Sequence, residues 1–444
     1  MNFAQALSYL LSLGHETLAM KLGLTSTETL LASLENPQNA FRAVQIAGTN
    51  GKGSTATFLD SICRHAGIRT GLFTSPHLVS ITERIKINGE QISEEEFARL
   101  TSLVSETAAR LVARAALPAL PTFFEQVTAI ALLAFREARV ELAILETGLG
   151  GRLDSTTAAK AQVVAITSIA MDHEEYLGST IAEIAAEKAA IIRAGVTAVI
   201  APQTAEAMDV IMRRCETQGV NPTLVATQTF SPDMNLSGDG RCQITIENTG
   251  GREKIQLGLR GRHQIDNASV AVTLAERLAE VGFKISRAAI VHGLESARHA
   301  GRLELWPGRP SLLFDGAHNP AAARALRNYL DEFVKAPLTL IFGAMKDKRL
   351  QEMAGLLFPK ANTLILTGID NPRAASLQDL LAAVPTDFDR QRIRTALNIN
   401  EALAQAREIT PDDGLICITG SLYLIGAAQK ACSTNFSLSQ DSTS

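Results

Sequence analysis

Short runs of consecutive apolar residues alternate with stretches of helical spacing along most of the chain. The runs predict strands at 43–47, 70–73, 140–146, 163–167 and 198–200, and again at 312–314, 338–342, 363–366 and 415–419. Between them, apolar residues recur at intervals of three and four, as in 123–135 and 180–192, which indicates helices. Strands that alternate with helices of this length are typical of mostly parallel sheets with helices on their faces.

Breaks in this rhythm predict how the chain is divided. Residues 227–260 are polar and alternating around glycine-rich turns, which predicts a small β excursion late in the first domain. The segment Ala-Arg-His-Ala-Gly at 297–301 ends a helical stretch before a new strand. We therefore expect an α/β chain with a domain at 1–298 and a smaller α/β domain at 299–430. The Ser- and Thr-rich residues 431–444 are expected to be disordered.

Composition and charge narrow the class of protein. The 444 residues are 46% hydrophobic and 20% charged with a net charge of −4, so the chain is globular and has no basic footprint for nucleic acid. No apolar run approaches the ~20 residues of a membrane helix, and the first residues carry no export signal. The five cysteines are scattered without C-x-x-C spacing, which favours reduced thiols and a cytoplasmic location.

The glycine-rich segment 48–54, Gly-Thr-Asn-Gly-Lys-Gly-Ser, follows the first strand and precedes a helix. Such a turn can hold phosphate, because backbone N–H groups and the helix N-terminus converge on anionic oxygens. Lys52 can reach the β- and γ-phosphates and the Ser54 hydroxyl can bind Mg²⁺. The segment differs from the common G-x-x-x-x-G-K-[ST], since Gly53 separates the lysine from the hydroxyl. The alternative is an ordinary βα turn with a solvated lysine, but the strand and helix around it favour nucleotide binding.

Polar residues also follow several other predicted strands. Glu146 ends one strand, and Asp172 and His173 follow the next. Carboxylates at strand ends beside a phosphate loop are suited to bind Mg²⁺. Simpler interpretations stay open on spacing alone: a plain Ser-Pro turn at Ser75, a surface histidine at His173, and a solvated helical lysine at Lys188.

The ordered set of motifs resembles folylpolyglutamate synthase, which in bacteria is often bifunctional with dihydrofolate synthase, within the Mur ligase superfamily. The resemblance runs from about residue 5 to 428, and the inserted Gly53 resembles the folate branch. The motifs that carry it are 48–54, Thr74-Ser75-Pro76-His77-Leu78, Glu146 with 148–154, Asp172-His173, Glu187-Lys188, His263-Gln264, Asn267, Gly301-Arg302, 315–320 and Gly420-Ser421-Leu422-Tyr423.

The resemblance implies a fold and a reaction. The fold would be an N-terminal P-loop Mur-ligase-like ATPase domain with a mostly parallel sheet and a smaller Rossmann-like C-terminal domain. The reaction would be ATP-dependent ligation of L-glutamate to dihydropteroate or reduced folates through an acyl phosphate, with release of ADP and phosphate. The family is usually monomeric, so a monomer is expected.

Residue roles follow from the same resemblance, position by position. Nucleotide binding would involve Thr49, Asn50, Gly51, Lys52, Gly53, Ser54, Asn267, Arg302 and Asp315. Two Mg²⁺ ions would be held by Ser54, Ser75, Glu146, His173 and Lys188, the lysine as a carbamate formed with CO₂. The catalytic residues would be Lys52, Lys188 and His318, and Phe124 and Asp154 would bind the folate. Two departures from the family pattern, Ser155-Thr156-Thr157 and Ala190, bear on folate preference and on local packing.

Two other functions compete with this interpretation. One is a Mur-type ligase for a cell-wall precursor, against which stand Gly53 and the lack of an obvious UDP-binding domain before residue 44. The other is a P-loop switch or regulatory ATPase. That function would leave the second α/β domain and its Asp-Gly-Ala-His-Asn-Pro segment at 315–320 unexplained.

Overall fold

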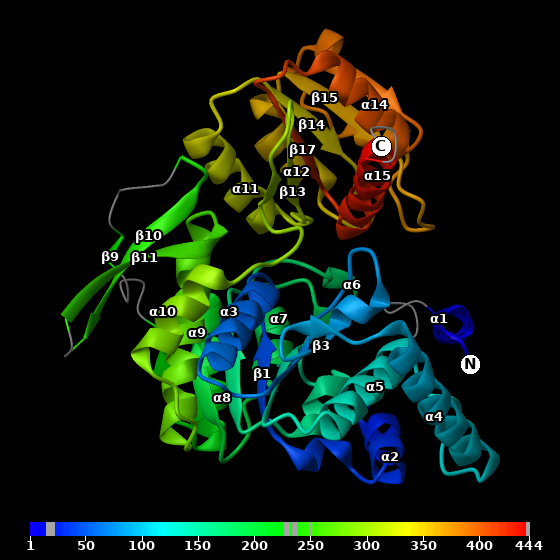
Figure 1. Ribbon diagram of the computed structural model, residues 1–444, viewed down its shortest axis with the longest axis vertical. Coiled ribbons are helices and arrows are strands. Elements are labelled where there is room, and N and C mark those ends of the chain that lie inside the picture. Colours follow the sequence, from blue (N-terminus) through cyan, green and yellow to red (C-terminus); the bar gives the residue numbers. More distant parts are fainter. Residues whose placement is uncertain (15–22, 226–230, 233–237, 249–250, 441–444) are drawn as a thin grey trace.

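The computed structural model describes residues 1–14, 23–225, 231–232, 238–248 and 251–440. In this part of the chain the strands form one eight-stranded, one three-stranded and one six-stranded sheet. Figure 1 shows the larger sheet and its helices in blue to green, and the six-stranded sheet above them in yellow to red. The predicted α/β class with two helix-covered sheets is confirmed. No helix of the described residues combines the length and apolarity needed to cross a membrane.

The larger sheet has the order β4-β3-β2-β5-β1-β6-β7-β8. Its strands are β1 (Arg42–Ala47), β2 (Thr70–Phe73), β3 (Ile85–Ile87), β4 (Glu90–Gln91), β5 (Leu142–Glu146), β6 (Val163–Ile166), β7 (Thr197–Ile200) and β8 (Thr223–Leu224). The neighbouring strands β2, β5, β1, β6, β7 and β8 run parallel. Strands β3 and β4 pair antiparallel at the β2 edge of the sheet. Side chains of β1 enter two cores, Val44 and Ile46 on one face and Ala43 and Ala47 on the other. Burial on both faces explains why these strands read as continuous apolar runs.

Helices cover both faces of this sheet. Against one face lie α3 (Lys52–His65), α9 (His263–Glu280) and α10 (Arg287–Ser296). The core of the other face includes residues of α1 (Phe3–Ser12), α2 (Thr25–Ser33), α4 (Glu94–Ala113), α5 (Phe123–Glu137), α7 (Ile181–Ala189) and α8 (Ala205–Gln218). The short α6 (Glu174–Leu177) follows β6.

The predicted β excursion is present as an antiparallel sheet of β9 (Ser231–Pro232), β10 (Arg241–Asn248) and β11 (Gly251–Arg260). Parts of the predicted range 227–260 lie outside the described residues. In Figure 1 this sheet projects to the left of the larger sheet. Residues that flank this sheet contact the part of the chain that carries the six-stranded sheet. The Tyr329 hydroxyl donates to the carbonyl of Asp239, just before β10, at 3.2 Å, and Arg262, just after β11, pairs with Glu332 at 2.6 Å.

The second body has the sheet order β12-β13-β17-β14-β15-β16, parallel except for β12. Its strands are β12 (Glu304–Trp306), β13 (Ser311–Asp315), β14 (Leu338–Phe342), β15 (Thr363–Thr367), β16 (Ile393–Ala396) and β17 (Leu415–Thr419). Its helices are α11 (Pro320–Phe333), α12 (Leu350–Leu357), α13 (Leu377–Ala382), α14 (Ile399–Ile409) and α15 (Leu422–Gln440). Separate cores fill its two faces.

The disorder expected for residues 431–444 stays a prediction. Helix α15 continues to Gln440, and residues 441–444 lie outside the described residues. Cys432 is buried in the core shared with β13, β14 and β17, and no Gly or Pro interrupts the segment after Gly426. The division expected between 298 and 299 falls in the connection from α10 to β12 and stays a prediction.

Candidate functional site

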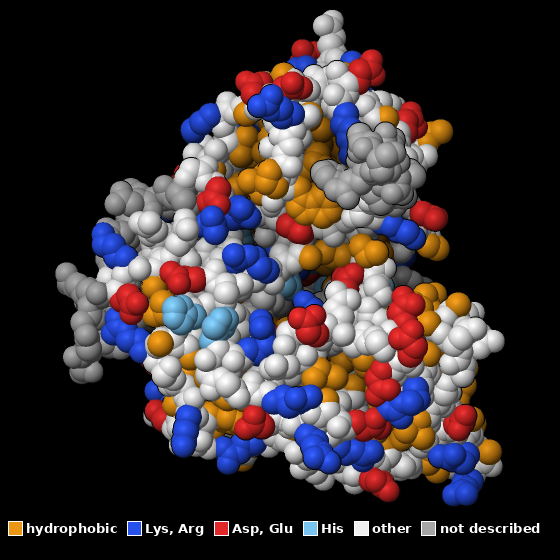
Figure 2. All heavy atoms as spheres, viewed as in Figure 1, with side chains coloured by type: hydrophobic (Ala, Val, Ile, Leu, Met, Phe, Trp, Pro, Cys, Tyr) orange, Lys and Arg blue, Asp and Glu red, His pale blue; other side chains and the backbone are white. Residues whose placement is uncertain are grey.

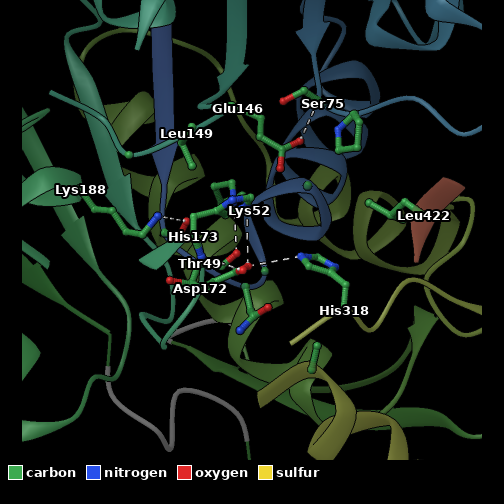
Figure 3. Close-up of a pocket in the computed structure, with 18 of the residues that line it drawn as sticks. Thr49, Lys52, Ser75, Glu146, Leu149, Asp172, His173, Lys188, His318 and Leu422 are labelled. Atoms are coloured by element: carbon green, nitrogen blue, oxygen red, sulfur yellow. Dashed lines mark hydrogen bonds and ion pairs between the residues drawn. The ribbon is translucent and has the colours of Figure 1, made fainter. Parts of the chain in front are cut away.

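A cavity of about 480 Å³ lies where the carboxyl ends of the two parallel sheets face each other. Every residue predicted for the site lines it: Thr49, Asn50, Gly51, Lys52, Gly53, Ser54, Ser75, Phe124, Glu146, Asp154, His173, Lys188, Asn267, Arg302, Asp315 and His318. Figure 3 shows how the labelled side chains from both bodies point toward one another. On the face in Figure 2, charged side chains of both signs lie along the junction of the two bodies.

The glycine loop is fixed by close packing against neighbouring segments. Gly51 has φ 88° and caps α3, and a β-carbon there would lie 2.2 Å from the Asn267 side-chain oxygen. A β-carbon on Gly48, which has φ 149°, would lie 1.9 Å from the Thr167 hydroxyl. Both glycines are therefore required by space and by backbone conformation. No side chain caps the N-terminus of α3, which leaves its first N–H groups available to an anionic ligand.

Two lysines share one backbone oxygen in this loop. Lys52 Nζ donates to the Gly48 carbonyl at 3.1 Å and to the Thr49 carbonyl at 3.2 Å, and Lys188 Nζ donates to the Gly48 carbonyl at 2.9 Å. Burial lowers the pKa of Lys52. Burial, together with the charge of Lys52, lowers the pKa of Lys188 to about 7. Lys188 is thus an unusual lysine that is substantially neutral near pH 7.

Oxygen donors gather at the first turn of α3. The Glu146 carboxylate accepts the Ser75 backbone N–H at 3.2 Å, and a β-carbon on Gly53 would lie 3.3 Å from Glu146 Oε2. The Ser54 hydroxyl accepts a hydrogen bond from Gln264 at 3.3 Å. Burial raises the pKa of Glu146, while the positive charge of Lys52 opposes that rise.

The oxygen and nitrogen donors of the protein supply only part of the ligand set that a divalent cation needs. His173 Nδ1 is buried without a hydrogen-bond partner, and burial lowers the pKa of His173 to about 3, so the ring is a neutral donor. Within the described ranges, no three His, Cys, Asp or Glu residues group closely enough to hold a metal. A site of hydroxyl and carboxylate oxygens completed by phosphate and water nevertheless suits Mg²⁺, which keeps several waters and substrate oxygens.

The second body contributes side chains that hold loops together. Asp315, at the end of β13, accepts the backbone N–H groups of Leu303 at 2.9 Å and Ala317 at 3.0 Å. Burial raises the pKa of Asp315. His318 Nδ1 donates to the Gly316 carbonyl at 2.7 Å, which leaves Nε2 facing the first body. Asp315 thus fixes the connection that carries Arg302 into the cavity.

The side of the cavity predicted for folate is aromatic and apolar. The Phe124 ring lies over Gly148, where a β-carbon would approach it to 2.5 Å, and the Phe73 ring centroid is 5.8 Å away. Asp154 accepts the N–H groups of Gly148 at 2.8 Å and Leu149 at 3.0 Å. Burial raises the pKa of Asp154. The structure therefore shows Asp154 holding the glycine-rich loop in place beside Phe124.

The sequence pattern singled out Asp172 only by its position after a strand, and it gave no role to two basic residues of the cavity, Lys348 and Arg373. Asp172 Oδ1 accepts from Lys348 Nζ at 2.7 Å, and His318 Nε2 lies 3.4 Å from Asp172 Oδ2. Burial alone would raise the pKa of Asp172, but the hydrogen bond and charge of His318 and the charge of Lys348 hold it well below its usual range. The strand-end position pointed to Asp172, whereas nothing in the spacing singled out Lys348 or Arg373.

Comparison with known proteins agrees with the two-part architecture. Residues 46–275 match the Mur ligase middle domain, and residues 301–422 match the glutamate ligase domain of Mur ligases. A dihydrofolate synthase/folylpolyglutamate synthase of Bacillus subtilis is 35% identical over 94% of this chain and 96% of its own length. A probable bifunctional folylpolyglutamate synthase/dihydropteroate synthase of Halobacterium salinarum is 37% identical over 98% of this chain. The chain spans about half the length of that relative (52%) and of its counterpart in Haloferax volcanii (50%).

Solved structures show the same arrangement. Mycobacterium tuberculosis folylpolyglutamate synthase complexed with ADP superposes with a TM-score of 0.89 at 31% identity, over 96% of this chain and 97% of that one. A bifunctional folylpolyglutamate synthase/dihydrofolate synthase with Mn, AMPPNP and L-glutamate bound has a TM-score of 0.82 at 27% identity, over 98% of each chain. The chain belongs to the Mur ligase family, in its group of folylpolyglutamate and dihydrofolate synthases.

Proposed function

We propose that the chain is an ATP-dependent carboxylate–amine ligase that adds L-glutamate to dihydropteroate, to reduced folates, or to both. The observation that carries this proposal is the single cavity that joins a phosphate loop, buried lysines and carboxylates of one body to cationic side chains of the other. The names of the relatives and the nucleotide and glutamate of the neighbouring structures support it.

The proposed reaction proceeds by two successive displacements. A carboxylate oxygen of the acceptor attacks the γ-phosphorus of ATP, the bond to the bridging oxygen breaks, and ADP leaves. The neutral amine of glutamate then attacks the acyl carbon and loses one proton, so that an amide forms and phosphate leaves with the former carboxylate oxygen. The protein's task is to position these groups and to offset negative charge.

The glycine loop and the second body divide that task. We assign nucleotide binding to Thr49, Asn50, Gly51, Lys52, Gly53, Ser54, Asn267, Arg302 and Asp315. Lys52 supplies a cation at the phosphoryl group, and His318 approaches the reacting groups from the second body. Phe124 and the loop held by Asp154 form the folate side, where an aromatic face suits a flat pteridine ring.

The proposed metal site would hold two Mg²⁺ ions on Ser54, Ser75, Glu146, His173 and Lys188. Bound Mg²⁺ offsets the negative charge of the phosphates. Lys188 would join this set as a carbamate, formed when its neutral amine adds to CO₂ with loss of one proton. A pKa of about 7 and the buried position beside Gly48 support that modification, because neutral amine is available near pH 7.

The organisation of the protein follows from the same proposal. We place the division into domains at 1–298 and 299–430, supported by matches to the family's two domains at 46–275 and 301–422. We expect a monomer, as the resemblance to the family implies. The five cysteines are buried and free of disulfides, which supports a cytoplasmic location.

The test is ADP release by the purified protein with Mg²⁺, L-glutamate and, separately, dihydropteroate or tetrahydrofolate. Turnover that requires glutamate and occurs with both acids establishes the bifunctional enzyme, and turnover with one acid assigns the corresponding synthase. ATP hydrolysis that ignores both glutamate and the acid overturns the ligase proposal. Turnover with neither acid moves the assignment to another Mur-type acceptor.

A further inference from the structure

One buried carboxylate of the first body receives three side chains from the second. Asp172 lies between β6 and α6, 3.4 Å from His318 Nε2. Lys348 Nζ donates to Asp172 Oδ1 at 2.7 Å, and the Asn319 amide donates to Asp172 Oδ2 at 3.1 Å. The Asn319 amide also donates to Asn50 in the glycine loop at 3.0 Å. Figure 3 shows Asp172 between the glycine loop and His318.

The pairing of Lys348 with Asp172 is buried on both sides. The side chains of Lys348 and Asp172 are 8% and 6% exposed. A buried charge is costly without its partner, so each of these groups depends on the docking of the two bodies. The loop of Lys348 is held in turn by Arg373, which contacts Asp347 at 3.2 Å, and by a bridge between Met345 and Ala374.

Asp172 precedes His173 in the sequence and contacts His318 of the second body. Within the first body, the His173 backbone N–H donates to Asp172 Oδ1 at 2.9 Å. A shift of the Asp172 carboxylate would therefore move a proposed metal ligand in one body and a proposed catalytic ring in the other.

We propose that Lys348 is a positioning residue whose ammonium group holds Asp172, so that the His173 loop and the His318 ring take their working orientations only when the two bodies are docked. The kinetic part of this inference rests on the proposed function. It assigns Lys348 no direct contact with substrate, although Lys348 lines the cavity.

The chain offers a matched control in the next residue. Arg349 also crosses between the bodies, to Glu174 at 2.7 Å, from the same loop to the same region of the first body. These side chains are 39% and 36% exposed. Exposed ion pairs contribute little, so loss of the Arg349 pair should leave the docking intact.

The experiment compares Lys348→Met, Asp172→Asn, the double variant and Arg349→Gln. Lys348→Met and Asp172→Asn should each lower kcat at least about 30-fold with KM values within about 3-fold, as expected for lost positioning of reacting groups. The double variant should be no worse than about 3-fold below the poorer single variant, because both changes remove one interaction. Arg349→Gln should stay within about 3-fold of the unmutated protein.

Hydrogen exchange supplies a readout that does not depend on activity. Amides of 171–177 and 345–350 should exchange faster in Lys348→Met and at the unmutated rate in Arg349→Gln. Multiplicative losses in the double variant, or a raised KM for one substrate at unchanged kcat, would make Lys348 a substrate-binding residue and overturn the inference. Unchanged exchange in Lys348→Met would also overturn it. If the unmutated protein lacks ligase turnover, the proposed function fails, and hydrogen exchange still decides the docking role.

Discussion

The two parallel sheets end at the same cavity but contribute different chemistry. The first body offers a rigid backbone cradle at 48–54, with Lys52 and Lys188 held on the Gly48 carbonyl. The second body offers side chains on loops, among them His318 and Lys348, which cross the junction to Asp172. On the proposed function, the first body supplies the cradle for phosphate, whereas the second body adds side chains through contacts that exist only on docking.

This difference separates binding from turnover. Changes in the cradle should affect the use of ATP, and changes at the junction should affect kcat while ATP binding persists. Single substitutions in the two regions test that separation.

Lys52→Ala should lower kcat/KM for ATP by about 10³-fold, because removal of a preorganised charge at a transferring phosphoryl group typically costs that much. Steady-state ADP release measures the effect. Lys284→Ala, an exposed lysine far along the chain, is the control for loss of one charge. An unchanged kcat/KM for ATP would remove Lys52 from the mechanism.

Lys188→Ala should lower kcat by about 10²-fold while the Kd of ATP changes little, since the phosphate cradle stays intact and a proposed metal ligand is lost. Nucleotide titration by calorimetry and ADP release give the two values. Activity near that of the unmutated protein would refute the carbamate role, and a matching loss of ATP affinity would place Lys188 in the cradle.

The same lysine predicts a pH-dependent stability. Its pKa is about 7 in the folded chain against 10.5 in the unfolded chain, so between these values the unfolded chain binds more protons and stability rises with pH. In CO₂-free buffer the unmutated protein should have a lower free energy of unfolding than Lys188→Met, and this difference should be greatest below about pH 7. It should shrink above that, by up to about 1.4 kcal/mol per pH unit. Urea unfolding of both proteins at pH 6 to 9 measures this difference. A difference in the free energy of unfolding that does not change with pH would contradict the lowered pKa of Lys188.

Phe124→Leu should raise KM for the pteridine acid by about 5- to 10-fold, the size of one lost aromatic contact, with KM for ATP unchanged. The substitution keeps an apolar side chain over Gly148. A change in KM for ATP instead would show that Phe124 does not separate the folate side from the nucleotide side.

The parts of the site that lie close together in the sequence were predictable. The glycine loop, Glu146 and the motif at 315–320 each join a strand end to polar residues, so local pattern located them. Lys348 was not predictable, because its partner Asp172 is 176 residues away and the pairing depends on how two bodies dock. Short edge strands such as β12 and β16 were missed because they are only partly buried and lack an apolar run.

The most direct test of the central claim follows one oxygen atom. The acceptor acid is labelled with ¹⁸O in its carboxylate, and the phosphate released with ATP and L-glutamate is analysed by mass spectrometry. Transfer through an acyl phosphate predicts one labelled oxygen in the phosphate and one glutamyl residue added to the acid. Unlabelled phosphate, released at the same rate, would mean that water and not the carboxylate attacks ATP, and would contradict the account.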